Sequence, residues 1–144
     1  MFSSFTPYSN KELTERRIKD IHFLILANKR VDAGKYRNMQ VSILGAKHKP
    51  VSPFLIEMKI KQLLDEYDSS SENVIVKIAK FRLDFESIHP FIDGNDRTGR
   101  LLLNLQVMQN KLPPIGIQYT NRANTISALM SIIWIMIYQV WLTW

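Results

Sequence analysis

Apolar side chains recur at helical spacing in four stretches of the chain, separated by short polar or proline-containing segments. This pattern predicts helices at about 11–28, 53–67, 74–88 and 95–110. Each predicted helix has a start signal: Asn10 as a cap, Pro53 at a first helical position, Glu72 or Asn73 as a cap, and Asn95 directly after a glycine. The chain should therefore fold as a helical bundle.

The faces expected to point inward follow from the same spacing. In the first three predicted helices these positions are Leu13, Ile18, Ile21, Leu24 and Ile25; then Leu55, Met58, Ile60, Leu63 and Leu64; then Val74, Ile75, Ile78, Phe81 and Phe85.

The segment from Asn38 to Pro53 has a different pattern, because Gly45 and two prolines interrupt any helix. Patchy alternation favours a short β-hairpin through Val41–Ile43 and Lys47–Lys49. The expected fold class is mainly α with one hairpin, and residues 1–144 form a single domain because no linker or repeat divides them.

Composition narrows the classes of function. The net charge of +6 favours polyanionic ligands in general, but the basic residues are spread along the chain, so we expect no specific nucleic-acid partner. No cysteine is present, which excludes disulfides and thiolate metal sites and fits a cytoplasmic protein. The N-terminus has no apolar signal segment, although secretion into a host cell without a cleaved signal stays open.

Residues 125–144 carry no charge and include an almost wholly apolar run around Trp134. A buried C-terminal helix is the favoured interpretation. Two alternatives are a membrane tail anchor, which the polar residues within the segment and the lack of a following basic residue disfavour, and a non-native tail such as a shifted reading frame.

The segment from His89 to Arg100 carries the candidate chemistry. A helix that begins near Asn95 directs its first backbone N–H groups at the preceding loop, and arginines in its first turns add positive charge. Such a helix end binds anions. Since His89 precedes it by a few residues and is able to act as a base, and Asp93 is able to bind a metal, the segment indicates nucleotide chemistry.

The same segment, HPFIDGNDRTGR, resembles the signature of the Fic family, H-P-F-x-[D/E]-G-N-G-R-x-x-R, with Asp96 in place of the third glycine. Ala33–Arg37 with Val41 resembles the family's aGxyR…V segment. The likeness covers about residues 21–124. It implies a Fic-type helical bundle in which 41–53 is a hairpin flap.

Family resemblance also implies the chemistry, which is transfer of AMP from ATP to a Ser, Thr or Tyr hydroxyl of a target protein. His89 would be the general base and Asp93 the ligand of Mg²⁺. The nucleotide phosphates would be bound by Gly94, Asn95, Asp96, Arg97 and Arg100. The flap would hold an extended target segment by main-chain hydrogen bonds, through Ser42, Ile43, Leu44, Gly45, Lys47 and His48. His22 lacks such a context and is interpreted as structural, and so is the imidazole of His48.

Asp96 sets a second interpretation beside the first, because a carboxylate replaces the glycine that lets backbone approach phosphate. At roughly 5 Å and an effective dielectric constant near 20, its repulsion of one phosphate charge is about 3 kcal/mol. The alternatives are a degenerate Fic domain that binds a nucleotide or partner without turnover, or a transferase of phosphoryl or another nucleotidyl group. The related Doc branch, which transfers phosphoryl, has Lys at this position.

Fic proteins are often restrained by a helix with the pattern [S/T]-x-x-x-E-[G/N], and no Ser or Thr of this chain has Glu four residues later. Three alternatives for regulation follow: inhibition by a separate, antitoxin-like protein, loss of the inhibitory segment, or no need for inhibition. The other partner expected is a protein substrate with an exposed hydroxyl.

Overall fold

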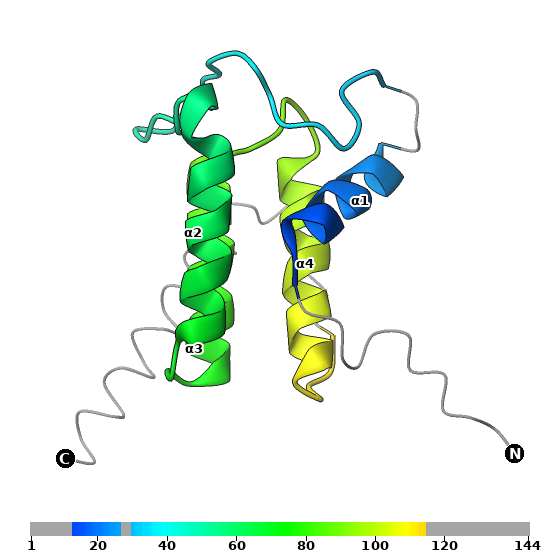
Figure 1. The fold of residues 1–144 in the computed structure, drawn as a ribbon, viewed down its shortest axis with the longest axis vertical. Helices are drawn as coiled ribbons and strands as arrows, with labels where there is room; N and C mark the ends of the chain where they lie inside the picture. The colour runs from blue at the N-terminus through cyan, green and yellow to red at the C-terminus, as the bar shows by residue number, and fades with distance from the viewer. Residues whose placement is uncertain (1–12, 27–29, 115–144) are drawn as a thin grey trace, which may run out of the picture.

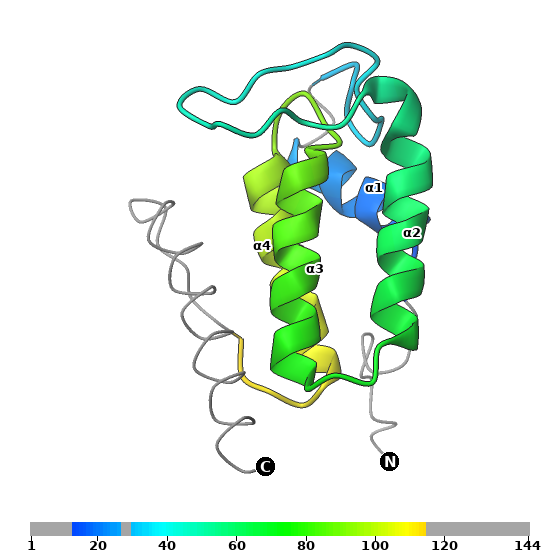
Figure 2. The same cartoon turned by 90° about the vertical axis from the view of Figure 1, so that its left-hand side faces the viewer.

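The computed structural model describes residues 13–26 and 30–114, and the regular structure within them is helical. The elements are α1 (Glu15–Ile25), the 3₁₀ turn η1 (Pro53–Leu55), α2 (Ile56–Ser69), α3 (Val74–Ile88) and α4 (Asn95–Gln109). α3 packs between α2 and α4, and α1 crosses one end of α4 (Figures 1 and 2). The expectation of a mainly helical fold is confirmed.

Side-chain caps fix where two of the helices begin. The Asn73 side chain accepts a hydrogen bond from the N–H of Ile75 at 2.9 Å, which confirms one of the two predicted caps of α3. Thr14 caps α1 through the N–H of Arg17 at 3.3 Å. The proposed cap Asn10 lies outside the described residues.

The core lies where α1, α2, α3 and α4 face one another. Its fully buried side chains include Ile18, Ile56, Ile60, Phe85, Phe91 and Leu102. The inward positions predicted for Leu24, Leu55, Met58 and Ile75 are wrong, because all four side chains are exposed. In the first two turns after Pro53, Ile56 takes the buried position instead, so the apolar stripe of α2 is narrower than its sequence suggests.

The flap, residues 41–53, contains no strand, so the predicted hairpin is not seen. Its reversal is a turn in which Ala46 N–H donates to the carbonyl of Ile43 at 3.1 Å. Pro50 and Pro53 each lack an N–H, and the Gln40 side chain donates to the carbonyl of Pro50 at 3.0 Å. Side chains therefore take the place of a β-ladder, and the segment arches over the ends of α3 and α4 (Figure 2).

The uncharged segment 125–144 lies outside the described residues, so the three interpretations of it stay untested. Within the described part of the chain, none of the helices has the length and apolar character needed to cross a membrane.

Candidate active site

The loop between α3 and α4 lies at the end of the bundle over which the flap passes (Figure 2). His89 is the C-cap of α3 and has a left-handed backbone, with φ 51° and ψ 62°. This conformation costs a non-glycine residue about 1–2 kcal/mol. Its N–H donates to the carbonyl of Phe85 at 3.1 Å, which ends the helix. The chain thus turns sharply at the residue predicted to be the base.

A buried arginine holds this turn. Arg37 donates from Nε to the carbonyl of His89 at 2.7 Å and from Nη2 to the carbonyl of Ile88 at 3.3 Å. The same guanidinium donates to the carbonyl of Met39, just before the flap, at 2.9 Å, and to the carbonyl of Val51 near the end of the flap. Burial lowers the pKa of Arg37. One side chain therefore fixes both the left-handed His89 and the base of the flap.

Asn95 closes the loop from the other side. Its side-chain oxygen accepts from the N–H of Phe91 at 2.9 Å, and its Nδ2 donates to the carbonyl of Phe91 at 2.7 Å. Thr98 donates from Oγ1 to the carbonyl of Gly94 at 2.7 Å. Because the Asn95 amide is used internally, the groups that Asn95 offers to an anion are those of its backbone. The prediction that Phe91 packs in the core and fixes the loop is confirmed.

His22 is fully buried beneath the same loop and connects it to the segment around Gly34. Its ring stacks on Phe91 with the centroids 3.6 Å apart. Gly34 N–H donates to its Nδ1 at 2.9 Å, so Nε2 carries the proton and donates to the carbonyl of Asp93 at 2.7 Å. Burial lowers the pKa of His22, against smaller raising effects that include this hydrogen bond. The interpretation of His22 as structural is confirmed.

The carboxylate of Asp93, the predicted ligand of Mg²⁺, is 54% exposed at the end of the loop. Its Oδ1 accepts from Gly94 N–H at 2.7 Å, and its Oδ2 pairs with Arg30 at 3.0 Å. The described residues contain no cluster of three His, Cys, Asp or Glu side chains suited to a metal. This donor set fits Mg²⁺ only together with phosphate oxygens and water, which is the usual way proteins bind that ion.

The carboxylate of Asp96 is largely buried between α3 and α4 and pairs with an arginine of each helix. Its Oδ1 pairs with Arg82 of α3 at 2.9 Å, and its Oδ2 pairs with Arg100 of α4 at 3.1 Å. The backbone of Asp96 is helical, within α4, so the position needs no glycine for its φ angle. The glycine-like left-handed residue is Gly94, with φ 78°.

The two predicted phosphate-binding arginines therefore differ. Arg97 is exposed and forms no ion pair with the described residues, whereas Arg100 is bound to Asp96. Both lie in the first two turns of α4, beside the backbone N–H groups that a helix leaves without intrahelical acceptors. The arrangement offers one exposed cation and one paired cation to an anion.

His48 connects the flap to α3, which gives it a structural contact. Its Nε2 lies 2.8 Å from the hydroxyl of Ser87 and 3.1 Å from the carbonyl of the same residue. The other proposed target-binding positions of the flap, Ser42, Ile43, Leu44, Gly45 and Lys47, belong to the arch, where Leu44 is fully exposed.

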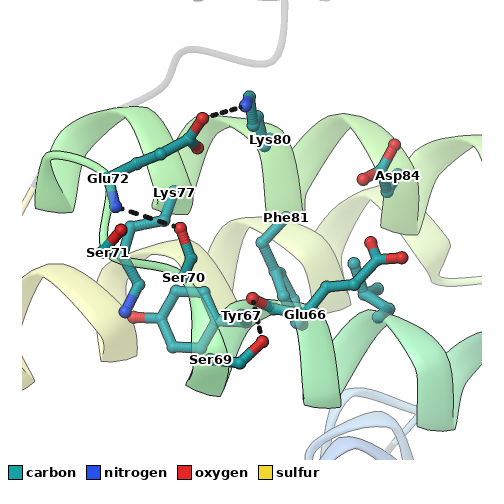
Figure 3. A pocket seen from close by; sticks show the side chains of 11 residues that line it. Glu66, Tyr67, Ser69, Ser70, Ser71, Glu72, Lys77, Lys80, Phe81 and Asp84 are labelled. Carbon is teal, nitrogen blue, oxygen red and sulfur yellow. Dashed lines mark hydrogen bonds and ion pairs between the residues drawn. The ribbon is translucent and has the colours of Figure 1, made fainter.

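Two pockets follow the groove between α2 and α3 and are lined by no residue from 89 to 100. The larger, of about 370 Å³, lies toward the loop that joins these helices, where Lys80 pairs with Glu72 (Figure 3). The smaller, of about 220 Å³, reaches Val51 and Ser87 near the flap. Asp84 lines both, and burial, with the Glu66 carboxylate next in size, raises its pKa. The candidate site lies outside these pockets, at the end of the bundle.

Three arginines of the site were missed as individual predictions: Arg30, Arg82 and, beyond its place in the aGxyR likeness, Arg37. Arg82 and Arg37 are buried, and a buried arginine needs carbonyls or carboxylates around it. No local pattern identifies the partners that tie these arginines to the loop, because Asp96, His89 and Asp93 lie 14, 52 and 63 positions away from Arg82, Arg37 and Arg30.

At one end of this helical bundle, a loop joins a left-handed histidine to a glycine-capped helix start, and paired arginines of α3 and α4 lie beside it. The match of the Fic/DOC family to residues 12–107 says which class of protein this is: the chain belongs to the Fic/DOC family.

Similar proteins carry this family's activity in their names. The chain is 36% identical over 129 residues to the protein adenylyltransferase fic-1 of Caenorhabditis elegans, covering 83% of this chain and 25% of that protein. It is 37% identical over 95 residues to a probable protein adenylyltransferase of Aquifex aeolicus, covering 65% and 29%.

Solved structures agree on the fold. A Fic domain-containing signaling protein of Bacteroides thetaiotaomicron superposes with a TM-score of 0.74 at 27% identity, over 85% of this chain and 48% of that one. Fic-1 of C. elegans superposes with a TM-score of 0.69 at 28% identity, over 88% and 38%. The chain spans about a quarter of the length of the curated relatives named above.

Proposed function

We propose that the chain is a protein adenylyltransferase domain, which moves AMP from ATP to a hydroxyl group of a target protein. The observation that carries the proposal is the loop from His89 to Asn95. It holds an imidazole in a constrained turn directly ahead of the glycine-capped start of α4. The names of the similar proteins support the same activity.

In this mechanism the target hydroxyl attacks the α-phosphorus of ATP, the bond to the bridging oxygen between the α- and β-phosphates breaks, and pyrophosphate leaves. The hydroxyl proton passes to the imidazole of His89, which acts as general base. The strained backbone of His89 fixes where that imidazole stands, and the two hydrogen bonds of Arg37 to carbonyls 88 and 89 hold the strain in place.

The phosphates would lie against the first turn of α4, bound by its backbone N–H groups and by Arg97 and Arg100. Asp93 would hold Mg²⁺, which neutralises phosphate charge when bound. The Oδ2 of Asp93 now pairs with Arg30 and would have to release that arginine to become a ligand. The exposed flap would hold the target segment beside His89. Because the flap forms no β-ladder, its main-chain N–H and C=O groups would be able to pair with that segment.

A second candidate function is nucleotide or partner binding without turnover, and the ion pair between Asp96 and Arg100 favours it. That pair occupies one of the two arginines proposed to hold phosphate, so part of the phosphate-binding charge is already neutralised. A third candidate, transfer of a phosphoryl group, would use the same loop with the γ-phosphate as the group transferred.

One labelling experiment separates the three. The purified chain is incubated with Mg²⁺, a lysate as the source of acceptor proteins, and ATP labelled at either the α- or the γ-phosphate, beside a His89→Ala variant whose melting curve verifies folding. Label from the α-phosphate that depends on His89 supports adenylyl transfer. Label from the γ-phosphate alone replaces it with phosphoryl transfer. If the chain binds nucleotide but no protein is labelled, the second candidate, binding without turnover, is supported.

A further inference from the structure

Asp96 belongs to a chain of charges that links α3 to the start of α4. Glu86 pairs with Arg82, Arg82 with Asp96 at 2.9 Å, and Asp96 with Arg100 at 3.1 Å. Arg82 is its most buried member, and exposure rises from there toward α4: Arg82 is 8% exposed, Asp96 15% and Arg100 22%, while Glu86 on the other side is 20% exposed. The carboxylate of Asp96 is thus fixed on its buried side and neutralises a cation on its open side.

The place of the Arg82 side chain depends on the absence of a side chain at Gly99. A Cβ atom added at Gly99 would stand 2.5 Å from Nη1 of Arg82, so the guanidinium occupies the space that a side chain at this position would need. Gly99 occupies a position that the Fic signature leaves open. Arg82, Asp96 and Gly99 therefore fit one another as a unit, and Asp96 has a defined place in the fold.

We propose that Asp96, held by the positioning residue Arg82, is a permanent counter-ion of Arg100 that removes this chain's preference for a triphosphate over a diphosphate. This inference rests on the proposed function, because it takes Arg100 as the residue that meets the terminal phosphate of the nucleotide. A terminal phosphate must displace or share the Asp96 carboxylate, and it also meets the negative charge of that carboxylate.

The effect is confined to the end of the nucleotide. Phosphates held by backbone N–H groups and by Arg97 do not depend on Arg100, so a diphosphate and a triphosphate obtain nearly the same binding. We expect Mg²⁺-ATP and Mg²⁺-ADP to bind the native chain with dissociation constants within about threefold of each other. Arg82 and Arg100 already offset part of the Asp96 charge, so its repulsion of a terminal phosphate is weaker than that of an unpaired carboxylate, and we expect it to change affinity by roughly tenfold.

The test is calorimetric titration with ATP, ADP and AMP, each with Mg²⁺, into the native chain and Asp96→Asn. The asparagine keeps the shape of Asp96 and an acceptor for Arg82 but removes the charge. We expect Asp96→Asn to raise the affinity for ATP about tenfold. The affinities for ADP and AMP should rise by less than about threefold. Glu72→Gln removes the same charge at the far end of α3, where Glu72 pairs with Lys80, and should change neither ratio.

Arg82→Met tests the positioning role. Without Arg82, the carboxylate of Asp96 pairs with Arg100 alone, so the affinity for ATP should fall about threefold relative to the affinity for ADP. In the Asp96→Asn background the same substitution should leave the ATP-to-ADP ratio unchanged. A purely structural role would lower the melting temperature in both backgrounds and move neither ratio, which would overturn the assignment of Arg82.

The outcomes also separate this inference from the function beneath it. If the native chain and Asp96→Asn both bind nucleotides but with the same ATP-to-ADP ratio, the counter-ion proposal is overturned and the proposed function stands. If neither chain binds any of the three nucleotides, the proposed function fails and the inference fails with it.

Discussion

Arg37 offers the sharpest test of how the candidate base is held. Its guanidinium donates to four backbone carbonyls, those of His89, Ile88, Met39 and Val51. We consider Arg37→Met, which keeps most of the aliphatic stem and removes all of these donors.

The expected loss follows from this geometry. Each hydrogen bond from a charged donor contributes about 1 kcal/mol or more, so four contribute at least about 4 kcal/mol. The native state, however, bears the cost of burying a charge, as the lowered pKa of Arg37 indicates, and methionine relieves it. We therefore expect the free energy of unfolding to fall by about 3–4 kcal/mol, or roughly 10–15 °C in melting temperature.

The measurement is urea unfolding followed by circular dichroism at 222 nm. Arg16→Met is the matched control, because its side chain is 91% exposed and its substitution should stay within about 0.5 kcal/mol. Where the variant folds at low temperature, His89-dependent labelling should also fall, since His89 loses the hydrogen bonds that hold its turn. A loss of stability below about 1 kcal/mol would refute the view that Arg37 holds the turn.

Three further predictions concern the same end of the bundle and its supports. Gly94→Ala should cost about 1–2 kcal/mol in urea unfolding, because φ at Gly94 is 78° and an added Cβ meets the ring of His22 at 3.4 Å; an unchanged midpoint would contradict this. The lowered pKa of His22 means that the unfolded chain binds a proton more readily, so stability should decrease as pH falls below about 6.5. His22→Gln should lose this part of the slope between pH 7 and 5, and an equal slope in both chains would refute the assignment. Asn73→Ala should lower the unfolding free energy by about 1 kcal/mol, and Thr14→Ala by less because its cap bond is longer; a larger loss for Thr14 would reverse that reasoning.

The helices that hold the candidate site could be predicted because their signals are local. α3 begins after Asn73 and ends at Ile88, and α4 begins at Asn95, as the spacing and caps predicted. The flap could not be predicted in this way. Alternation suggested paired strands, but the hydrogen bonds of the segment are made by Gln40, Arg37 and His48, whose partners are not adjacent in a strand register.

The charges of the site were harder still to predict. The motif supplied Asp93, Asp96 and Arg100 as separate residues, and from the sequence alone Asp96 was expected beside the bound phosphates. Arg82 changes that result from a position 14 residues earlier, because helix packing brings α3 against the first turn of α4. Such a pairing depends on the packing of two helices, and no periodicity within either helix specifies it.

These pairings alter how the basic character of the chain relates to a nucleotide. The net charge of +6 suggests a surface that attracts polyanions, yet around the loop three arginines, Arg30, Arg82 and Arg100, pair with four carboxylates, those of Asp32, Asp93, Asp96 and Glu86. A nucleotide with Mg²⁺ would therefore exchange ion pairs, with the ion replacing Arg30 at Asp93 and phosphate competing with Asp96 for Arg100. Because each exchange breaks one ion pair for every new one that forms, affinity at this site depends on which carboxylate releases its arginine more readily, and the general charge of the protein contributes little to it.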